Sequence, residues 1–147
     1  MDARRFALAA GVVYILVGVA GFVPGLGTDR RTPDLAVDAL YFNLLGLFPV
    51  NVLHSLVHLA IGVAGVAASR SLGAARLYSR ALAVLYALLA VMGLIEAGNL
   101  NTAFRLIPLL SHDVWLHALT ALAAAYFGFG PAPAGGAVGP GAPGSAR

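Results

Sequence analysis

The sequence predicts an all-α fold, namely an integral membrane four-helix bundle with both chain ends on the cytoplasmic side. Of the 147 residues, 60% are hydrophobic and only 10% are charged, which is far more apolar than a typical water-soluble domain. Four apolar stretches, separated by segments that carry charges, Pro and Gly, are each about as long as a helix that crosses a hydrocarbon core of roughly 30 Å. The lipid bilayer is therefore the first expected partner.

The first membrane span is predicted at residues 6–23, an apolar run without a charged side chain. Arg4 and Arg5 precede it, as basic residues precede the apolar part of a signal peptide. However, the run exceeds the roughly 7–15 apolar residues of such a peptide, and further apolar stretches follow. We therefore expect the segment to be retained as a helix.

The second span is predicted at residues 49–68, with Pro49 in the first turn of the helix, a position that Pro tolerates. Residues 24–38 before it contain Pro, Gly and five charged residues, which is typical of a solvated loop. The apolar stretch 40–48 is too short to cross a bilayer. We expect it to lie at the membrane interface or to extend the second helix outward.

The third span is predicted at residues 74–97 and the fourth at residues 113–129. Residues 98–110 between them carry Asn, Arg and Pro and are predicted to form a loop. Residues 130–147 are rich in Pro, Gly and Ala without periodicity, so we expect a disordered cytoplasmic tail. The transmembrane domain thus covers residues 1–129.

The orientation is predicted from the arginines in the short loops, because basic residues favour the cytoplasmic side. The N-terminus and the turn after the second span carry more arginines than the two opposite loops. The first group is Arg4, Arg5, Arg70, Arg76 and Arg80, and the second is Arg30, Arg31 and Arg105. We therefore expect an N-in, C-in protein of the inner (plasma) membrane. The Ala, Gly and Arg content, with no Lys, is typical of a GC-rich bacterial genome.

Small residues recur within the predicted spans at spacings that allow two helices to approach closely. These residues are Ala7 and Gly11, then Gly18 and Gly21, then Ala60, Ala64 and Ala68, and finally Gly62 and Gly65. They predict tight helix contacts. One interpretation is a homo-oligomer that forms through these faces, and the other is a close-packed monomer.

The first and third predicted spans share the pattern VxYxLxxVxG, which begins at Val12 and at Val84. The second and fourth spans then share the dipeptides Leu53-His54 and Leu116-His117. Such a match is typical of a tandem duplication of two helical hairpins. It would place His54 and His117 at similar depth on opposite sides of the bundle.

The residues that can carry chemistry gather at the outer half of the predicted bundle. His54 and His58 lie four residues apart and thus on one face of a helix. Glu96 ends the third span on the same side, and Asp113 and His117 begin the fourth. Because a histidine within a membrane is costly unless it faces a cavity, a partner or a ligand, the pair indicates a functional site.

Several chemistries fit this set of residues. His54 or His58 opposite His117 could supply axial ligands to a b-type haem. A divalent metal could use His54, His58, His117 and Asp113. A proton relay or a small transporter subunit is a further alternative. The structural interpretation is that the histidines hold helices together by hydrogen bonds to Asn51, Ser55, Tyr14, Tyr86 or a backbone carbonyl.

Two other side chains of the fourth span have structural interpretations. Asp113 can cap the helix, where the N-terminal dipole favours an acidic residue. Trp115 is expected to anchor the helix at the membrane interface.

Composition and motifs also argue against several classes of function. The net charge of +3 comes from scattered arginines rather than from a basic patch, so nucleic acid is not an expected partner. The absence of Cys excludes disulfides and thiolate metal sites. We find no nucleophile-base pair, phosphate-binding Gly loop or paired carboxylates, so the expected role is not enzymatic.

Two segments carry a resemblance to a known family. PVNVLHSLVHLAIGVAG contains LHxxxHL, and HDVWLHALTA contains DxWLH; together with GVAGFVPG they resemble a family of small bacterial four-helix membrane proteins labelled as a domain of unknown function. The resemblance covers nearly all of the chain up to Gly128. It implies that His54, His58, Asp113, Trp115 and His117 belong to the family pattern, whereas His112 and Glu96 do not. It implies no reaction.

Overall fold

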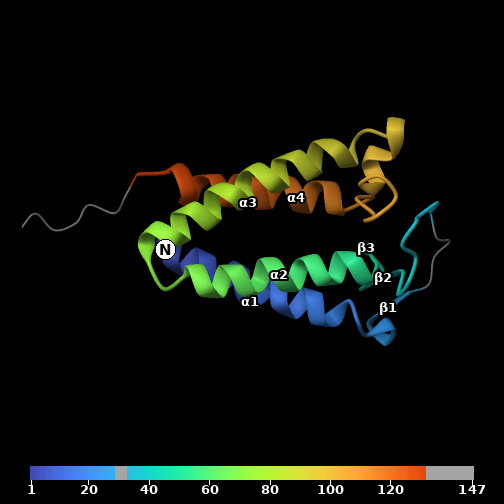
Figure 1. The fold of residues 1–147 in the computed structure, drawn as a ribbon, viewed down its shortest axis with the longest axis horizontal. Helices are drawn as coiled ribbons and strands as arrows, with labels where there is room; N and C mark the ends of the chain where they lie inside the picture. The colour runs from blue at the N-terminus through green and yellow to red at the C-terminus, as the bar shows by residue number, and fades with distance from the viewer. Residues whose placement is uncertain (29–32, 132–147) are drawn as a thin grey trace, which may run out of the picture.

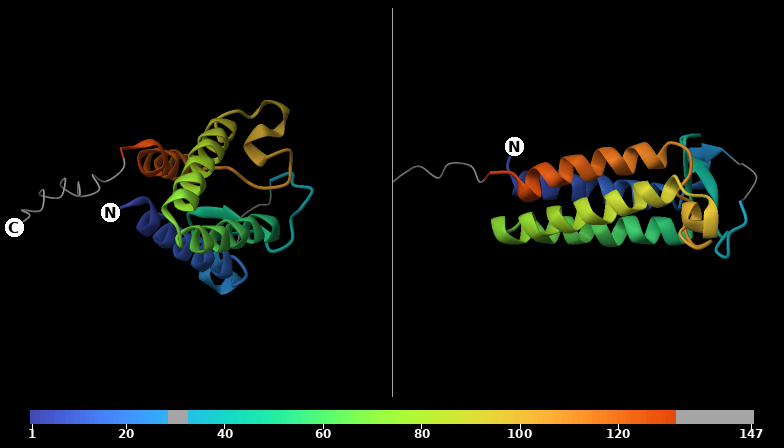
Figure 2. Two further views of the ribbon diagram at one scale, coloured as in Figure 1. Left: turned by 60° about the vertical axis from the view of Figure 1, so that its left-hand side comes forward. Right: turned by 90° about the horizontal axis from the view of Figure 1, so that it is seen from above.

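The computed structural model describes residues 1–28 and 33–131, and in these residues four α-helices dominate the fold. They lie side by side, and the chain runs up and down between two ends (Figures 1 and 2). The helices are α1 (Ala3–Ala20), α2 (Val52–Ala68), α3 (Leu72–Gly93) and α4 (Asp113–Phe129). Helix α1 packs mainly on α2, and α3 mainly on α4. The predominantly helical character that hydropathy predicted is thus confirmed. Two of the arginines that predict the orientation, Arg30 and Arg31, lie outside the described residues. Most of the predicted tail also lies outside them.

Two of the described helices, α1 and α3, are long and apolar enough to cross a membrane. Helix α2 is apolar but shorter, with 17 residues, and α4 has the same length. A four-span membrane bundle therefore stays a prediction.

The end of the molecule that joins α1 to α2 and α3 to α4 is not purely helical, and we call it the loop end. A three-stranded antiparallel sheet forms there from β1 (Gly27–Thr28), β2 (Phe42–Leu44) and β3 (Phe48–Val50). The prediction that the fold is entirely α-helical is to this extent wrong. The opposite end carries the N-terminus and the turn 69–71, and we call it the turn end.

Residues 40–48 do not extend the second helix but form a hairpin, and their location at the membrane interface stays a prediction. Leu45 and Gly46 have left-handed backbones, with φ of 55° and 73°, and they reverse the chain so that β2 pairs with β3. Phe42, Leu44 and Val50 bury their side chains in one cluster against α1. Burial of these apolar side chains stabilises the hairpin although the segment is short.

Helix α2 begins at Val52 rather than at Pro49, because Pro49 pairs with Asn43 in the sheet. Asn51 is the N-cap, and its side-chain oxygen accepts a hydrogen bond of 2.8 Å from the backbone N–H of His54. The Asn51 amide also donates to the carbonyl oxygens of Val37 and Leu106, both at 2.7 Å. One completely buried side chain thus joins the start of α2 to the two long connections of the loop end.

Helix α3 ends at Gly93, four residues before the predicted end of the third span. Gly98 and Asn99, with φ of 66° and 58°, interrupt the following 3-10 segment η2 (Ala97–Thr102). Helix α1 covers Ala3–Ala20 instead of residues 6–23, because Asp2 caps it through the backbone N–H of Arg5. This hydrogen bond lowers the pKa of Asp2, since it stabilises the charged carboxylate.

The close helix contacts that the small residues predicted occur within one chain, between α1 and α2. A Cβ atom on Gly11 would lie 2.6 Å from the backbone nitrogen of Val66, and one on Gly62 would lie 2.7 Å from the carbonyl oxygen of Gly11. Ala60 and Ala64 are instead exposed. The glycines are thus used inside the monomer, and a homo-oligomer through the exposed alanines stays a prediction.

Candidate functional site

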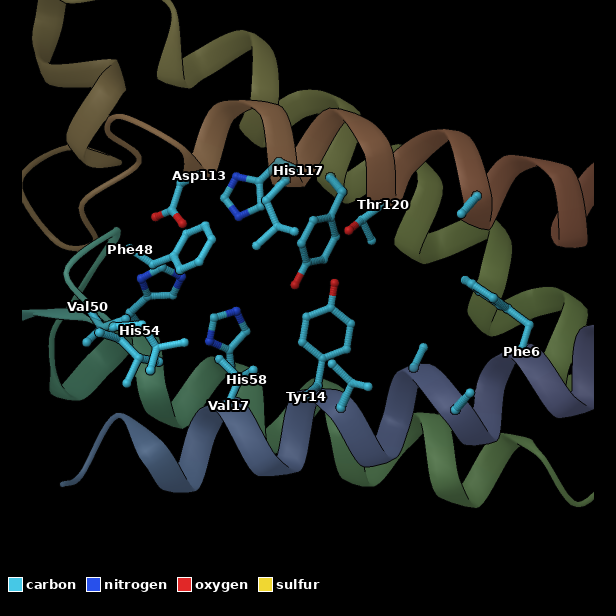
Figure 3. A pocket seen from close by; sticks show the side chains of 18 residues that line it. Phe6, Tyr14, Val17, Phe48, Val50, His54, His58, Asp113, His117 and Thr120 are labelled. Atoms are coloured by element: carbon cyan, nitrogen blue, oxygen red, sulfur yellow. The ribbon is translucent and has the colours of Figure 1, made fainter. Parts of the chain in front are cut away.

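A cavity of about 350 Å³ lies between α1 and α4 next to the loop end (Figure 3). The helices α2 and α3 and the hairpin of β2 and β3 complete its walls. Most of the lining is apolar, with a polar group at the loop end. The polar lining residues are Tyr14, His54, His58, Tyr86, Asp113, His117 and Thr120.

His54 and His58 form one side of this polar group, as their i, i+4 spacing predicted. Their rings are stacked with centroids 4.5 Å apart, and the ring of Tyr14 from α1 stacks on His58 at 5.4 Å. His54 Nδ1 lies 3.2 Å from the carbonyl oxygen of Pro49, a distance that suits an N–H donor. His54 is therefore held by the strand that precedes its helix, whereas His58 is held by ring contacts.

His117 approaches from α4 on the opposite wall, where Tyr86 of α3 contacts it edge-on with ring centroids 5.0 Å apart. The rings of Tyr14 and Tyr86 are 5.6 Å apart, and their hydroxyl groups point toward each other. The two tyrosines thus connect His58 to His117 across the space between the helical hairpins. The predicted common depth of His54 and His117 agrees with this arrangement, and both side chains line one cavity.

Three buried polar atoms of this group have no hydrogen-bond partner among the described residues: His58 Nδ1, His117 Nδ1 and Asp113 Oδ2. The three residues are only 8%, 3% and 3% exposed. Leaving a buried donor or acceptor unpaired costs roughly 1–3 kcal/mol, and nearly all such groups in native proteins are paired. Three unpaired atoms around one cavity are therefore typical of a binding site.

The structure brings together His54, His58, His117 and Asp113, which the sequence indicated, and it separates the other candidates. Asp113 does not cap α4, because His112 holds the N-cap position and no side chain caps the helix. The predicted capping role is thus wrong, and the Asp113 side chain lines the cavity instead. Trp115 is 68% exposed on the outside of α4.

His112 and Glu96, which the family pattern does not include, lie outside the cavity. His112 is exposed, and its Nδ1 lies 3.0 Å from the hydroxyl oxygen of Ser111. Glu96 is exposed at the N-cap of η2. Neither residue lines the pocket.

The metal and haem hypotheses differ in how well these side chains fit them. Within residues 1–28 and 33–131, no group of three or more His, Cys, Asp or Glu side chains is placed to hold a metal ion. A metal set of His54, His58, His117 and Asp113 therefore gains no support. Haem binding by His58 or His54 with His117 stays a prediction.

Sequence reasoning treated Tyr14 and Tyr86 only as hydrogen-bond partners, yet they are central to the site. A signal for them was present, because they occupy the same position in the pattern VxYxLxxVxG shared by the first and third spans. Thr120, whose side chain faces the same polar group, had no such signal.

Comparison with known families gives one match. The family described as a domain of unknown function (DUF4383) matches residues 4–130, a range that includes every residue of the pocket. No curated protein and no solved structure matches the chain.

Proposed function

The chain belongs to the DUF4383 family, as its two histidine motifs predicted, and we propose a function from its own pocket. It is a multi-pass protein of the inner (plasma) membrane that binds a small apolar molecule and is not an enzyme. The observation that carries this proposal is the set of three unpaired polar atoms at the end of a largely apolar cavity.

The membrane location is supported by the apolar side chains that all four helices expose. Monomeric soluble proteins rarely expose apolar patches of this extent, whereas lipid covers them at no cost. Polar atoms of the helix backbone are paired within the helices, as a bilayer requires. The exposed side chains include Leu8, Val12, Leu16 and Val19 on α1, Leu56 and Val63 on α2, Leu77, Val84, Leu88 and Val91 on α3, and Leu119, Leu122, Tyr126 and Phe129 on α4.

The proposed topology is N-in and C-in, with the loop end outside. Because the chain has no Cys, single cysteines can report which side of the membrane a position faces. Gly25 at the loop end and Gly73 near the turn end suit this purpose, since an added Cβ meets no atom within 4 Å at either position. A membrane-impermeant thiol reagent added to protoplasts is expected to label Gly25→Cys at once and Gly73→Cys only after permeabilisation. Labelling of both positions in sealed protoplasts would contradict four spans.

The proposed binding role is supported by the combination of apolar and polar side chains that line the pocket. Its apolar walls suit an apolar ligand body, and a few convergent polar groups suit one polar end, which is the usual composition of a small-molecule site. A ligand with a polar end can hydrogen-bond to the imidazole rings of His58 and His117, which line the cavity.

Transport has less support than binding. A path to the turn end would have to pass the buried side chains of Phe6, Leu82, Ala83, Ala121 and Ala124, which pack as one apolar cluster. Ala3, Ala7 and Ala75 close the same end in a second cluster. These clusters fill the core at the turn end, whereas the pocket extends along α1 as far as Phe6. Haem binding keeps a direct test, because a Soret band in the spectrum of the purified protein would establish it.

A double variant, H58L with H117L, separates binding from a structural role. If the histidines bind a ligand, the protein purified in mild detergent is expected to lose the small molecule that wild type carries, measured by mass spectrometry of organic extracts. Its melting temperature without ligand is expected to stay level or rise, because unpaired polar atoms are replaced by apolar ones.

His112→Leu is the matched control, since His112 is an exposed histidine outside the pocket. It is expected to keep the wild-type extract. If H58L with H117L lowers the melting temperature while the extracts stay identical, the histidines act only in helix packing and the proposed function is wrong.

A further inference from the structure

The pocket continues from its polar group as a groove between α1 and α4. One face of α1 lines it at Phe6, Ala10, Val13 and Val17, and one face of α4 lines it at Leu116 and Ala123. From Phe6 to Val17 the helix rises by about 16 Å, at roughly 1.5 Å per residue. The groove thus offers an extended hydrocarbon chain an apolar path about 16 Å long.

The groove is open along its side. Val13, Leu45 and Leu116 line it and are nevertheless 55%, 68% and 46% exposed. In a bilayer these residues face lipid, so a ligand can enter sideways between α1 and α4 without passing through water. Its polar end then meets the side chains of His58, His117 and Asp113, which line the cavity.

The polar end of the pocket limits the chemistry of the bound head group. Among residues 1–28 and 33–131 no Arg lines the cavity, so a phosphate or carboxylate head group would be buried there without a cation partner from these residues, which is strongly unfavourable. The ring of Phe48 and the rings of Tyr14 and Tyr86 border the same space and offer packing surfaces for a flat ring. The imidazole rings of His58 and His117 line the cavity from opposite walls (Figure 3).

We infer that the groove between α1 and α4 binds a lipid of the quinone class. Its uncharged ring lies among the aromatic side chains, its carbonyl oxygens accept hydrogen bonds from the imidazoles of His58 and His117, and its apolar tail lies between α1 and α4. The inference rests on the proposed binding function and adds the class of ligand and the path by which it enters.

The test compares probes that share a decyl tail and differ in the head group, using the full chain in lipid nanodiscs. The probes are decylubiquinone, decanol, decanoate and decyltrimethylammonium. Binding raises the melting temperature, because only the folded protein binds. Trp115, the one tryptophan of the sequence, is 68% exposed on the outside of α4, so quenching of its fluorescence by quinone in the lipid is subtracted with the Ala123→Phe variant.

Decylubiquinone is expected to quench Trp115 saturably and to raise the melting temperature more than the other three probes do. Ala123→Phe, which fills the groove from its exposed rim, is expected to weaken this binding by at least about tenfold. Leu122→Phe is the control, because Leu122 is 69% exposed and does not line the groove.

Each other outcome contradicts the quinone inference, the groove as the binding site or the proposed function. If decanol or decanoate binds as tightly as decylubiquinone, the quinone inference fails and the proposed binding of an apolar molecule stands. If decyltrimethylammonium binds tightest, the head group is a cation paired with Asp113 and the quinone inference again fails. Equal binding to Ala123→Phe and wild type would contradict the groove as the site of the tail. If no probe binds, the inference and the proposed function both fail.

Discussion

Gly11→Leu is expected to separate α1 from α2 and to leave little folded protein at ordinary temperatures. All three atoms nearest to a Cβ on Gly11 belong to the backbone of α2, at 2.6 Å from Val66, 2.8 Å from Gly62 and 3.0 Å from Gly65. A backbone cannot rotate aside as a side chain can, so the helices must move apart. Gly11→Ala is therefore expected to destabilise by roughly 1–3 kcal/mol, and Gly11→Leu by more. Thermal unfolding in a mild detergent measures both changes.

Gly73→Leu is the matched control for this prediction. Gly73 also lies in a helix, and a Cβ there meets no atom within 4 Å. Both substitutions gain helix propensity, about 1 kcal/mol relative to Gly, so the difference between them isolates the helix contact. A melting temperature of Gly11→Leu equal to that of Gly73→Leu would show that α1 and α2 do not approach as closely as their glycines indicate.

Hydropathy predicted the helices well because the apolar stretches are long and separated by charges, Pro and Gly. It failed at residues 40–48, where the outcome depends on contacts with α1 that are distant in sequence. Phe42, Leu44 and Val50 pack against Val17 and Ala20, and this packing makes a hairpin of a segment that is apolar enough to be read as part of a helix. The start of α2 followed from the same cause, since Pro49 is drawn into the sheet.

The sequence predicted which residues belong to the site, but it did not predict the cavity that they line. The spacing of His54 and His58 placed both on one helical face, and topology brought His117 near them. The capping interpretation of Asp113 was wrong because capping rules describe the end of a helix and not the cavity that neighbouring helices form beside it. The shape of the groove between α1 and α4 depends on how the hairpin of α1 and α2 packs against the hairpin of α3 and α4. The sequence carries no local signal for this packing.

Asn51→Leu is expected to destabilise the protein by roughly 3 kcal/mol or more and to loosen the loop end. The variant loses the cap of α2, a contribution of about 1 kcal/mol. It also leaves the carbonyl oxygens of Val37 and Leu106 without the amide that pairs them, at roughly 1–3 kcal/mol each when they stay buried. Thermal unfolding and amide hydrogen exchange of residues 33–38 and 103–109 measure the two effects.

Asn51→Ser divides the effect, because Ser retains an oxygen for the cap and lacks the amide. Its stability is expected to lie between that of wild type and that of Asn51→Leu. The matched control is Asn43→Leu: Asn43 is also buried at the loop end, but its amide nitrogen has no partner among the described residues. Replacing it is expected to change stability by less than about 1 kcal/mol, since its amide nitrogen makes no hydrogen bond among the described residues that could be lost. If Asn43→Leu and Asn51→Leu destabilise equally, burial of an amide and not the three hydrogen bonds of Asn51 determines the stability of the loop end.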